Sequence, residues 1–393
     1  MNERKPHHKR QPSKRLPKRP FHRKRKNKIA EQTQGNGTAL PIESSIDSPI
    51  DSSMAGSESA DSQEVSVNKP IPKRRNFRSR TTPAGEHRPI LLPEILELMQ
   101  PIAGKTVVDA TLGFAGHSEA ILSQLGENGM LIGCDLDPTH ENVIRTRLEK
   151  VGNPFRIHLG CNFAGLANVI AESGLSTVDI ILVDLGVSSM QIDDSSRGFS
   201  FMRTGPLDMR MNKTRGKSAA EVLQSASLEE LGELFAKYGD EPQAFEIAAA
   251  IVQERSIRPI TSTTQLTKLI QSVAPATIDY SPLPGMPSPR QQRLRPVARV
   301  FQSLRIHVNR EIDNIQALLR VAPYLLNPGG KLMMISFHSG EDRLVKTHLK
   351  EGLRQGIYEK ISEEIVRAAP QERFENPRSR SAKLRWGIRS QQL

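Results

Sequence analysis

Two glycines and three aspartates stand at the ends of successive apolar segments, where they could form a binding site for a nucleoside. The first segment ends in Asp109 and runs on through A-T-L-G-F-A-G, whose glycines are Gly113 and Gly116. Glycines let the backbone bend closely around a ligand and expose the amide groups at the start of the following helix. Asp135 lies 22 residues beyond Gly113, and an acidic residue at about that spacing usually accepts hydrogen bonds from ribose hydroxyls. Asp184 ends a further apolar segment, so the pattern indicates a nucleoside cofactor.

The glycine loop also indicates which cofactor it suits. A nicotinamide dinucleotide site uses G-x-G-x-x-G around a pyrophosphate, and a triphosphate site uses a lysine after its glycines. This loop reads G-F-A-G and has neither feature, which counts against a nicotinamide-dependent oxidoreductase. A cofactor with adenine and ribose but no phosphate fits better, and S-adenosylmethionine is the commonest of these. A tight strand-to-helix turn without any ligand is the alternative for an isolated G-x-x-G.

The segment after Asp184 is a candidate for contacts with a nucleic acid. It contains Ser188 and Ser189 and continues into R-G-F-S-F-M-R, with Phe199, Phe201 and Arg203. Aromatic and arginine side chains in an irregular loop suit stacking on a base and contact with phosphate. The alternative for these residues is a loop that packs against neighbouring helices, and for Asp184 it is a helix cap.

The elements that would position these residues alternate between strand and helix. Near-continuous apolar strands separated by helices indicate a parallel sheet covered on both faces. We therefore predict an α/β fold with a mostly parallel, Rossmann-like sheet, closed by an antiparallel strand at 381–390. The predicted parallel strands are 105–113, 129–137, 155–161, 177–187 and 331–337.

The pattern breaks between the fourth and fifth strands. Residues 191–295 contain amphipathic helical windows without a comparable strand, and a proline-rich edge at 280–291, which predicts an inserted all-helical domain. The next segment, 298–326, reads as one long helix. The predicted sheet domain therefore comprises 86–190 and 296–393.

Residues 1–85 form a separate region by composition. The net charge of the chain is +12, and residues 1–29 account for all of it with 13 Lys/Arg and one acid. Residues 31–70 are rich in Ser, Asp, Glu and Gly, so we predict a disordered basic and acidic low-complexity extension. The basic arm could add non-specific RNA contacts, act as a passive solubilising tail, or, as a weaker option, serve as a mitochondrial presequence.

Composition excludes several classes of protein. With Cys134 and Cys161 as the only cysteines, a disulfide framework and a cysteine-based zinc site are excluded, which fits a reducing compartment. No apolar run reaches the roughly 18 residues that a membrane span needs, and no apolar signal core follows Met1. The expectation is a cytoplasmic protein without a membrane contact.

Six segments of the chain closely resemble the MraW/RsmH family, over roughly residues 86–390. The block from Asp184 to Met211 is specific to that family. The segments are EHRPILLPEIL, DATLGFAGHSEAIL, DLGVSSMQIDDSSRGFSFMRTGPLDMRM, ARVFQSLRIHVNREI, NPGGKLMMISFHSGEDRLVK and ENPRSRSAKLR.

The resemblance implies a class I methyltransferase fold and an S-adenosylmethionine-dependent enzyme. Members of that family methylate the N4 atom of a cytidine in the decoding region of small-subunit (16S) ribosomal RNA, so the implied partner is that RNA, in the assembled or nearly assembled subunit. The rival from another class is an RNA-binding assembly factor that retains an inactive methyltransferase fold. The implied cofactor contacts are Ala115, Gly116, His117, Asp135, Phe163, Asp184 and Gln191.

The resemblance and the chemistry together suggest roles for the remaining candidates. Asp184 is the candidate catalytic acceptor near N4, with Ser188 or Ser189 beside it, or else only a cofactor ligand. A sulfonium is already a good leaving group, so no metal ion is expected, and no second His or Cys lies at ligand spacing from His117. Two positions depart from the family pattern: Ala115 replaces a glycine and Gly340 replaces a leucine.

Overall fold

The computed structural model describes residues 88–274 and 292–392, all within one compact unit, Asn76–Leu393. The predictions for the extension 1–85 and for the proline-rich edge at 280–291 lie outside the described residues. Among those described, no helix is both long and apolar enough to cross a bilayer.

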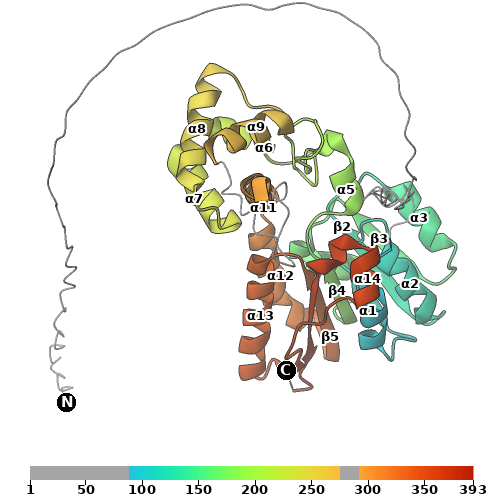
Figure 1. Ribbon diagram of the computed structural model, residues 1–393. Coiled ribbons are helices and arrows are strands. Elements are labelled where there is room, and N and C mark those ends of the chain that lie inside the picture. The colour runs from blue at the N-terminus through green and yellow to red at the C-terminus, as the bar shows by residue number, and fades with distance from the viewer. Residues whose placement is uncertain (1–87, 275–291, 393) are drawn as a thin grey trace, which may run out of the picture. The chain divides into compact units, whose positions relative to one another are not determined.

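A sheet lies at the centre of the described unit (Figure 1). It has seven strands in the order β3-β2-β1-β4-β5-β7-β6. Strands β1 to β5 pair in parallel, and β7 is antiparallel to both β5 and β6. This is the strand arrangement of class I methyltransferases, which confirms the predicted fold class. The strands are β1 (Thr106–Asp109), β2 (Met130–Asp135), β3 (Phe155–Leu159), β4 (Val178–Asp184), β5 (Leu326–Ser336), β6 (Tyr358–Ile361) and β7 (Lys383–Arg389).

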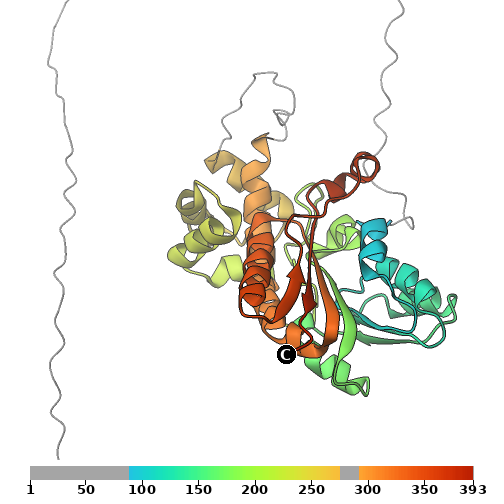
Figure 2. The same cartoon turned by 90° about the horizontal axis from the view of Figure 1, so that it is seen from below.

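Helices cover both faces of the sheet because the strands are apolar on both sides (Figures 1 and 2). One face packs against α4 (Leu166–Glu172), α12 (Glu311–Leu325) and α13 (Ser339–Arg354). The other packs against α1 (Leu92–Met99), α2 (Gly116–Leu125) and α3 (Glu141–Glu149). The remaining helical turns near the sheet are η1 (Phe163–Gly165), α5 (Ser189–Asp193), η2 (Ser195–Arg197), α14 (Pro370–Glu375) and η3 (Pro377–Arg380).

A separate apolar cluster forms from the helices between β4 and β5. Phe235, Ile247 and Leu266 are buried in this cluster together with Phe301. Serine caps with a reciprocal glutamate or glutamine begin three of its helices, as at Ser227 with Glu230. The helices are α6 (Ala219–Ser225), α7 (Leu228–Gly239), α8 (Ala244–Ile257), α9 (Thr263–Val273) and α11 (Arg295–Val308).

The prediction of one helix over 298–326 was wrong. The chain forms α11 and α12, with Asn309 and Arg310 between them, and Arg310 adopts a left-handed conformation with φ of 51°. The Asn309 side chain holds this break: its Nδ2 donates to the carbonyl of Met209 at 2.8 Å, and its Oδ1 accepts from the amide of Met211 at 2.8 Å. These contacts with a distant loop outweigh the helical pattern of the sequence.

Candidate functional site

A cavity of about 380 Å³ opens beyond the carboxyl ends of β1, β2 and β4. Gly113, Gly116, Asp135 and Asp184 all line this cavity. The volume falls within the range of sites for small molecules and cofactors. Neighbouring parallel strands end at one edge of the sheet, which explains why residues so far apart in the sequence meet there.

Asp135 is held so that its carboxylate faces the glycine loop. Oδ2 accepts from the amide of Gly113 at 2.7 Å, and Oδ1 accepts from the amide of Asp137 at 2.7 Å. Burial raises the pKa of Asp135 to about 6, partly offset by these two hydrogen bonds. Each carboxylate oxygen retains a second lone pair, so the group can also accept from a vicinal diol.

Asp184 presents one carboxylate oxygen without a hydrogen-bond partner. Oδ1 is buried and makes no hydrogen bond, while Oδ2 lies 4.0 Å from Nδ1 of His117. Nε2 of His117 lies 2.8 Å from the carbonyl of Ile90, and a carbonyl can only accept, so Nε2 carries a proton. Burial raises the pKa of Asp184 to about 6; the charge of His117 opposes this shift. A buried acceptor without a donor is costly, and one that lines a cavity is suited to a ligand.

Ser188 and Gln191 form a capping box at the start of α5. The Gln191 amide N–H donates to Oγ of Ser188 at 3.2 Å, and the Ser188 amide N–H donates to Oε1 of Gln191 at 3.0 Å. Nε2 of Gln191 also donates to Asp137 at 2.9 Å. Ser188, Ser189 and Gln191 line the cavity, so the cap fixes this wall of the site.

A buried ion pair joins the segment after Asp184 to the end of β2. Nη1 of Arg197 lies 2.7 Å from Oδ2 of Asp137, and the two side chains are only 7% and 9% exposed. Nη2 of Arg197 donates to the carbonyls of Arg210 and Met211. Burial alone would raise the pKa of Asp137, but its hydrogen bonds and the charge of Arg197 lower it below the usual value.

The other predicted residues divide between the cavity and the helical cluster. Phe163 and His117 line the cavity, whereas Ala115 is fully buried and does not line it. Ala115 precedes α2 in a left-handed conformation, with φ of 59°, which is where a glycine would cost least.

The structure does not bring Phe199, Phe201 or Arg203 to the cavity. Both phenylalanines pack against the helical cluster, Phe201 edge-on to Phe301 with ring centroids 5.5 Å apart. Nη2 of Arg203 lies 3.3 Å from Asp193. The alternative interpretation of this segment, a loop packed on neighbouring helices, describes these three residues.

The motifs and their spacing do not predict one polar wall of the cavity. Arg305, Asn309, Glu311 and Glu341 line it, from the α11–α12 break and the start of α13. Nε and Nη2 of Arg305 each donate to one oxygen of Glu311 at 2.8 Å. These residues lie within the family-like segments RIHVNREI and SFHSGED, so the resemblance was the available signal.

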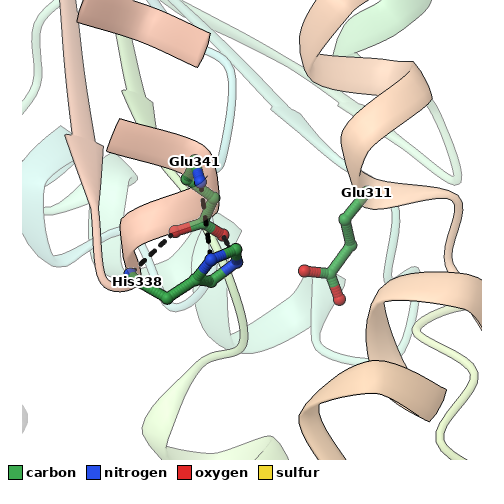
Figure 3. Close-up of side chains that lie close together, drawn as sticks. All are labelled: Glu311, His338 and Glu341. Carbon is green, nitrogen blue, oxygen red and sulfur yellow. Dashed lines mark hydrogen bonds and ion pairs between the residues drawn. The ribbon is translucent and has the colours of Figure 1, made fainter. Parts of the chain in front are cut away.

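Glu311, His338 and Glu341 are the described residues whose types and proximity could suit a metal ion (Figure 3), with ligand atoms within 4.8 Å of one another. Two contacts favour an ion-pair network instead. Arg305 already bonds both oxygens of Glu311. Nδ1 of His338 accepts from the amide of Glu341 at 3.4 Å, so Nε2 of a neutral ring carries a proton and cannot bind a metal. Nε2 lies 3.0 Å from Oε1 of Glu341.

Comparison with known proteins identifies the family. Residues 84–390 match the model of the MraW methylase family. The chain is 42% identical over 308 residues to ribosomal RNA small subunit methyltransferase H of Acidobacterium capsulatum, covering 76% of this chain and 97% of that one. It is also 42% identical over 317 residues to the protein of the same name from Thermomicrobium roseum, covering 76% and 92%.

Among solved structures, a putative rRNA methylase from Clostridium thermocellum aligns with 12% identity and a TM-score of 0.34, covering 77% of this chain and all of that chain. At that level the likeness carries no weight beside the topology and the sequence match. The family model spans most of the chain. The chain belongs to the MraW methylase family.

Proposed function

We propose that this protein transfers a methyl group from S-adenosylmethionine to the N4 atom of a cytidine in the decoding region of small-subunit ribosomal RNA. Family membership supports the reaction. The observation that supports this reaction for the present chain is that the glycine loop, Asp135 and Asp184 line one and the same cavity, where Oδ1 of Asp184 is buried and has no hydrogen-bond partner.

In this proposal residues at the ends of β1, β2 and β4 would hold the cofactor. The Gly116–His117 turn at the start of α2 would contact its amino-acid part, Asp135 would accept from its ribose hydroxyls, and Phe163 would pack against its base. Ala115 precedes this turn and is buried in the apolar core, so it contributes by packing. Gln191 contributes mainly by holding the wall through Ser188 and Asp137.

Asp184 is the proposed acceptor for a proton of the amine. The lone pair of an exocyclic cytosine nitrogen is delocalised into the ring, so the nitrogen is a poor nucleophile until it pyramidalises and loses a proton. S-adenosylmethionine supplies the electrophilic methyl group. Asp184 would accept the proton that N4 loses when it takes up this methyl group, and the target base must first leave its stack to enter the cavity.

The rate should depend on the ionisation of Asp184. An acceptor works only when it is ionised, and the pKa of this carboxyl is raised to about 6 by burial, with His117, Asp109 and Glu341 as the charged groups that act on it. We expect kcat to be level above pH 7 and to fall about tenfold per pH unit below pH 6. Single-turnover transfer at saturating cofactor measures this, which removes the effect of the raised pKa of Asp135. A rate that is independent of pH between 5 and 7 would contradict the role.

The reaction itself is tested by incubating the protein with unmodified small subunits and methyl-labelled S-adenosylmethionine. Nuclease digestion then maps the label. Label on N4 of one decoding-region cytidine supports the proposal. Tight cofactor binding without any transfer would support the rival, an assembly factor with an inactive fold.

Four further features complete the proposed role. The substrate is the assembled or nearly assembled small subunit rather than free RNA, and the protein works in the cytoplasm. We propose that residues 86–190 and 296–393 act as the methyltransferase domain and 191–295 as a helical insertion. The buried helical cluster between β4 and β5 supports an inserted helical unit, and this cluster extends past residue 295 because α11 packs in it through Phe301. The basic arm within 1–85 adds non-specific RNA contacts.

A further inference from the structure

Phe374 is the most exposed of the large apolar side chains in the described part of the chain, at 82%. It lies on α14, close in sequence to three other exposed residues that carry a positive charge: Arg367, Arg373 and Arg380. An exposed aromatic ring among arginines is typical of surfaces that stack on bases and contact phosphates.

The exposure of Phe374 does not come from a loose end of the chain. Glu372 on the same helix accepts from the amide of Leu91 at 3.2 and 3.3 Å through its two oxygens. Glu94 accepts from the amide of Ala369 at 3.2 Å, and both views draw α14 beside α1 (Figures 1 and 2). The helix is thus fixed on α1 with its aromatic ring facing outward.

The same segment continues to the mouth of the cavity. Arg378 on η3 and Ser381 just after it line the cavity, as does Arg88. Arg378 lies 3.6 Å from Asp193 at the end of α5. A strand that delivers its base to Asp184 therefore passes next to this segment.

The charges on residues 367–381 favour binding of a polyanion. The two acidic residues in this range already have partners: Glu372 accepts from the Leu91 amide, and Glu375 pairs with Arg88 at 3.2 Å. Nε of Arg380 donates to the carbonyl of Arg373 at 2.8 Å, which orients the guanidinium while leaving its terminal nitrogens for a phosphate. A protein partner would more often meet a larger apolar area than one ring.

We propose that residues 367–381, which we call the α14 ridge, bind single-stranded ribosomal RNA beside the target nucleotide. Phe374 stacks on a flanking base, while Arg373 and Arg380 contact phosphates of the same RNA strand. This inference rests on the proposed function for the identity of the RNA, and it adds where that RNA lies on the protein.

Binding and kinetics of Phe374→Ala test the ridge. Loss of one base stack should raise KM for small subunits about tenfold, with kcat and the affinity for S-adenosylmethionine unchanged. Phe374→Trp should keep KM near the wild-type value because it preserves the stack. The matched control is Tyr324→Ala: Tyr324 is 62% exposed and lies near the end of α12, next to the start of β5 and hence at the opposite edge of the sheet. It should leave KM unchanged.

A photo-crosslinking side chain at position 374 identifies the partner independently of methyl transfer. A crosslink to ribosomal RNA near the decoding region supports the ridge. A crosslink only to a ribosomal protein, or an unchanged KM for Phe374→Ala, would overturn it. So would a rise in KM that Phe374→Trp does not rescue, since that would indicate a structural role. Failure of the wild-type protein to methylate would instead count against the proposed function, because crosslinking and binding need no transfer.

Discussion

Asp184→Asn should lower the single-turnover rate of methyl transfer by roughly 10²–10⁴-fold, the contribution typical of a positioned general base. The asparagine keeps the shape of the side chain but has no negative charge with which to take a proton. Its buried Oδ1 position makes no hydrogen bond in the structure, so no existing contact is lost there. The measurement is transfer to small subunits at saturating S-adenosylmethionine.

Cofactor affinity, measured by calorimetry, separates the two roles of Asp184. An acceptor role predicts that Asp184→Asn binds S-adenosylmethionine within a few-fold of wild type while transfer is lost. Asp313→Asn, a carboxyl on α12 that is 57% exposed, is the matched control and should transfer normally. Normal transfer by Asp184→Asn at saturating cofactor would eliminate the acceptor role.

Arg197→Ala should lower the free energy of unfolding by about 3–5 kcal/mol, because it leaves a buried charge without its partner. Asp137 would lose a 2.7 Å ion pair, and the carbonyls of Arg210 and Met211 would lose their donor. Urea denaturation followed by circular dichroism measures the effect. The pair also joins the segment after Asp184 to β2, so activity should fall at temperatures where the variant is still folded.

Two variants check the source of that loss. Arg310→Ala removes an exposed pair with Asp313, whose side chains are 76% and 57% exposed, and should cost less than about 1 kcal/mol. The double variant Arg197→Ala with Asp137→Ala should be more stable than Arg197→Ala, because the unpaired charge is gone. If Arg197→Ala unfolds like Arg310→Ala, the buried pair does not hold the two segments together.

All strands of the sheet except β6, and the cavity wall that carries Asp135 and Asp184, could be predicted from the sequence. Buried parallel strands are short apolar runs that a local pattern reveals, and their polar residues must collect at one edge. Asp135 and Asp184 were therefore predictable as neighbours of one cavity, although their partners were not. β6 escaped prediction because its four residues alternate weakly and it borders the sheet only through β7.

The second wall of the cavity could not be predicted, for a physical reason. The break between α11 and α12 has no glycine or proline to mark it. It exists because Asn309 binds the backbone of Met209 and Met211, about one hundred residues earlier in the chain. No local pattern contains such a contact, so the helical periodicity alone favoured one continuous helix and hid the placement of Arg305 and Glu311.

The Asn309 side chain acts as both donor and acceptor, which limits the residues that can replace it. At that junction one nitrogen must donate to the Met209 carbonyl, and one oxygen must accept from the Met211 amide. An aspartate has the same outline but would turn an acceptor toward a carbonyl. Deamidation of Asn309 replaces its side-chain nitrogen with oxygen. It would therefore remove the hydrogen bond to the Met209 carbonyl, which links the α11–α12 wall of the cavity to this loop, without altering the size of the side chain.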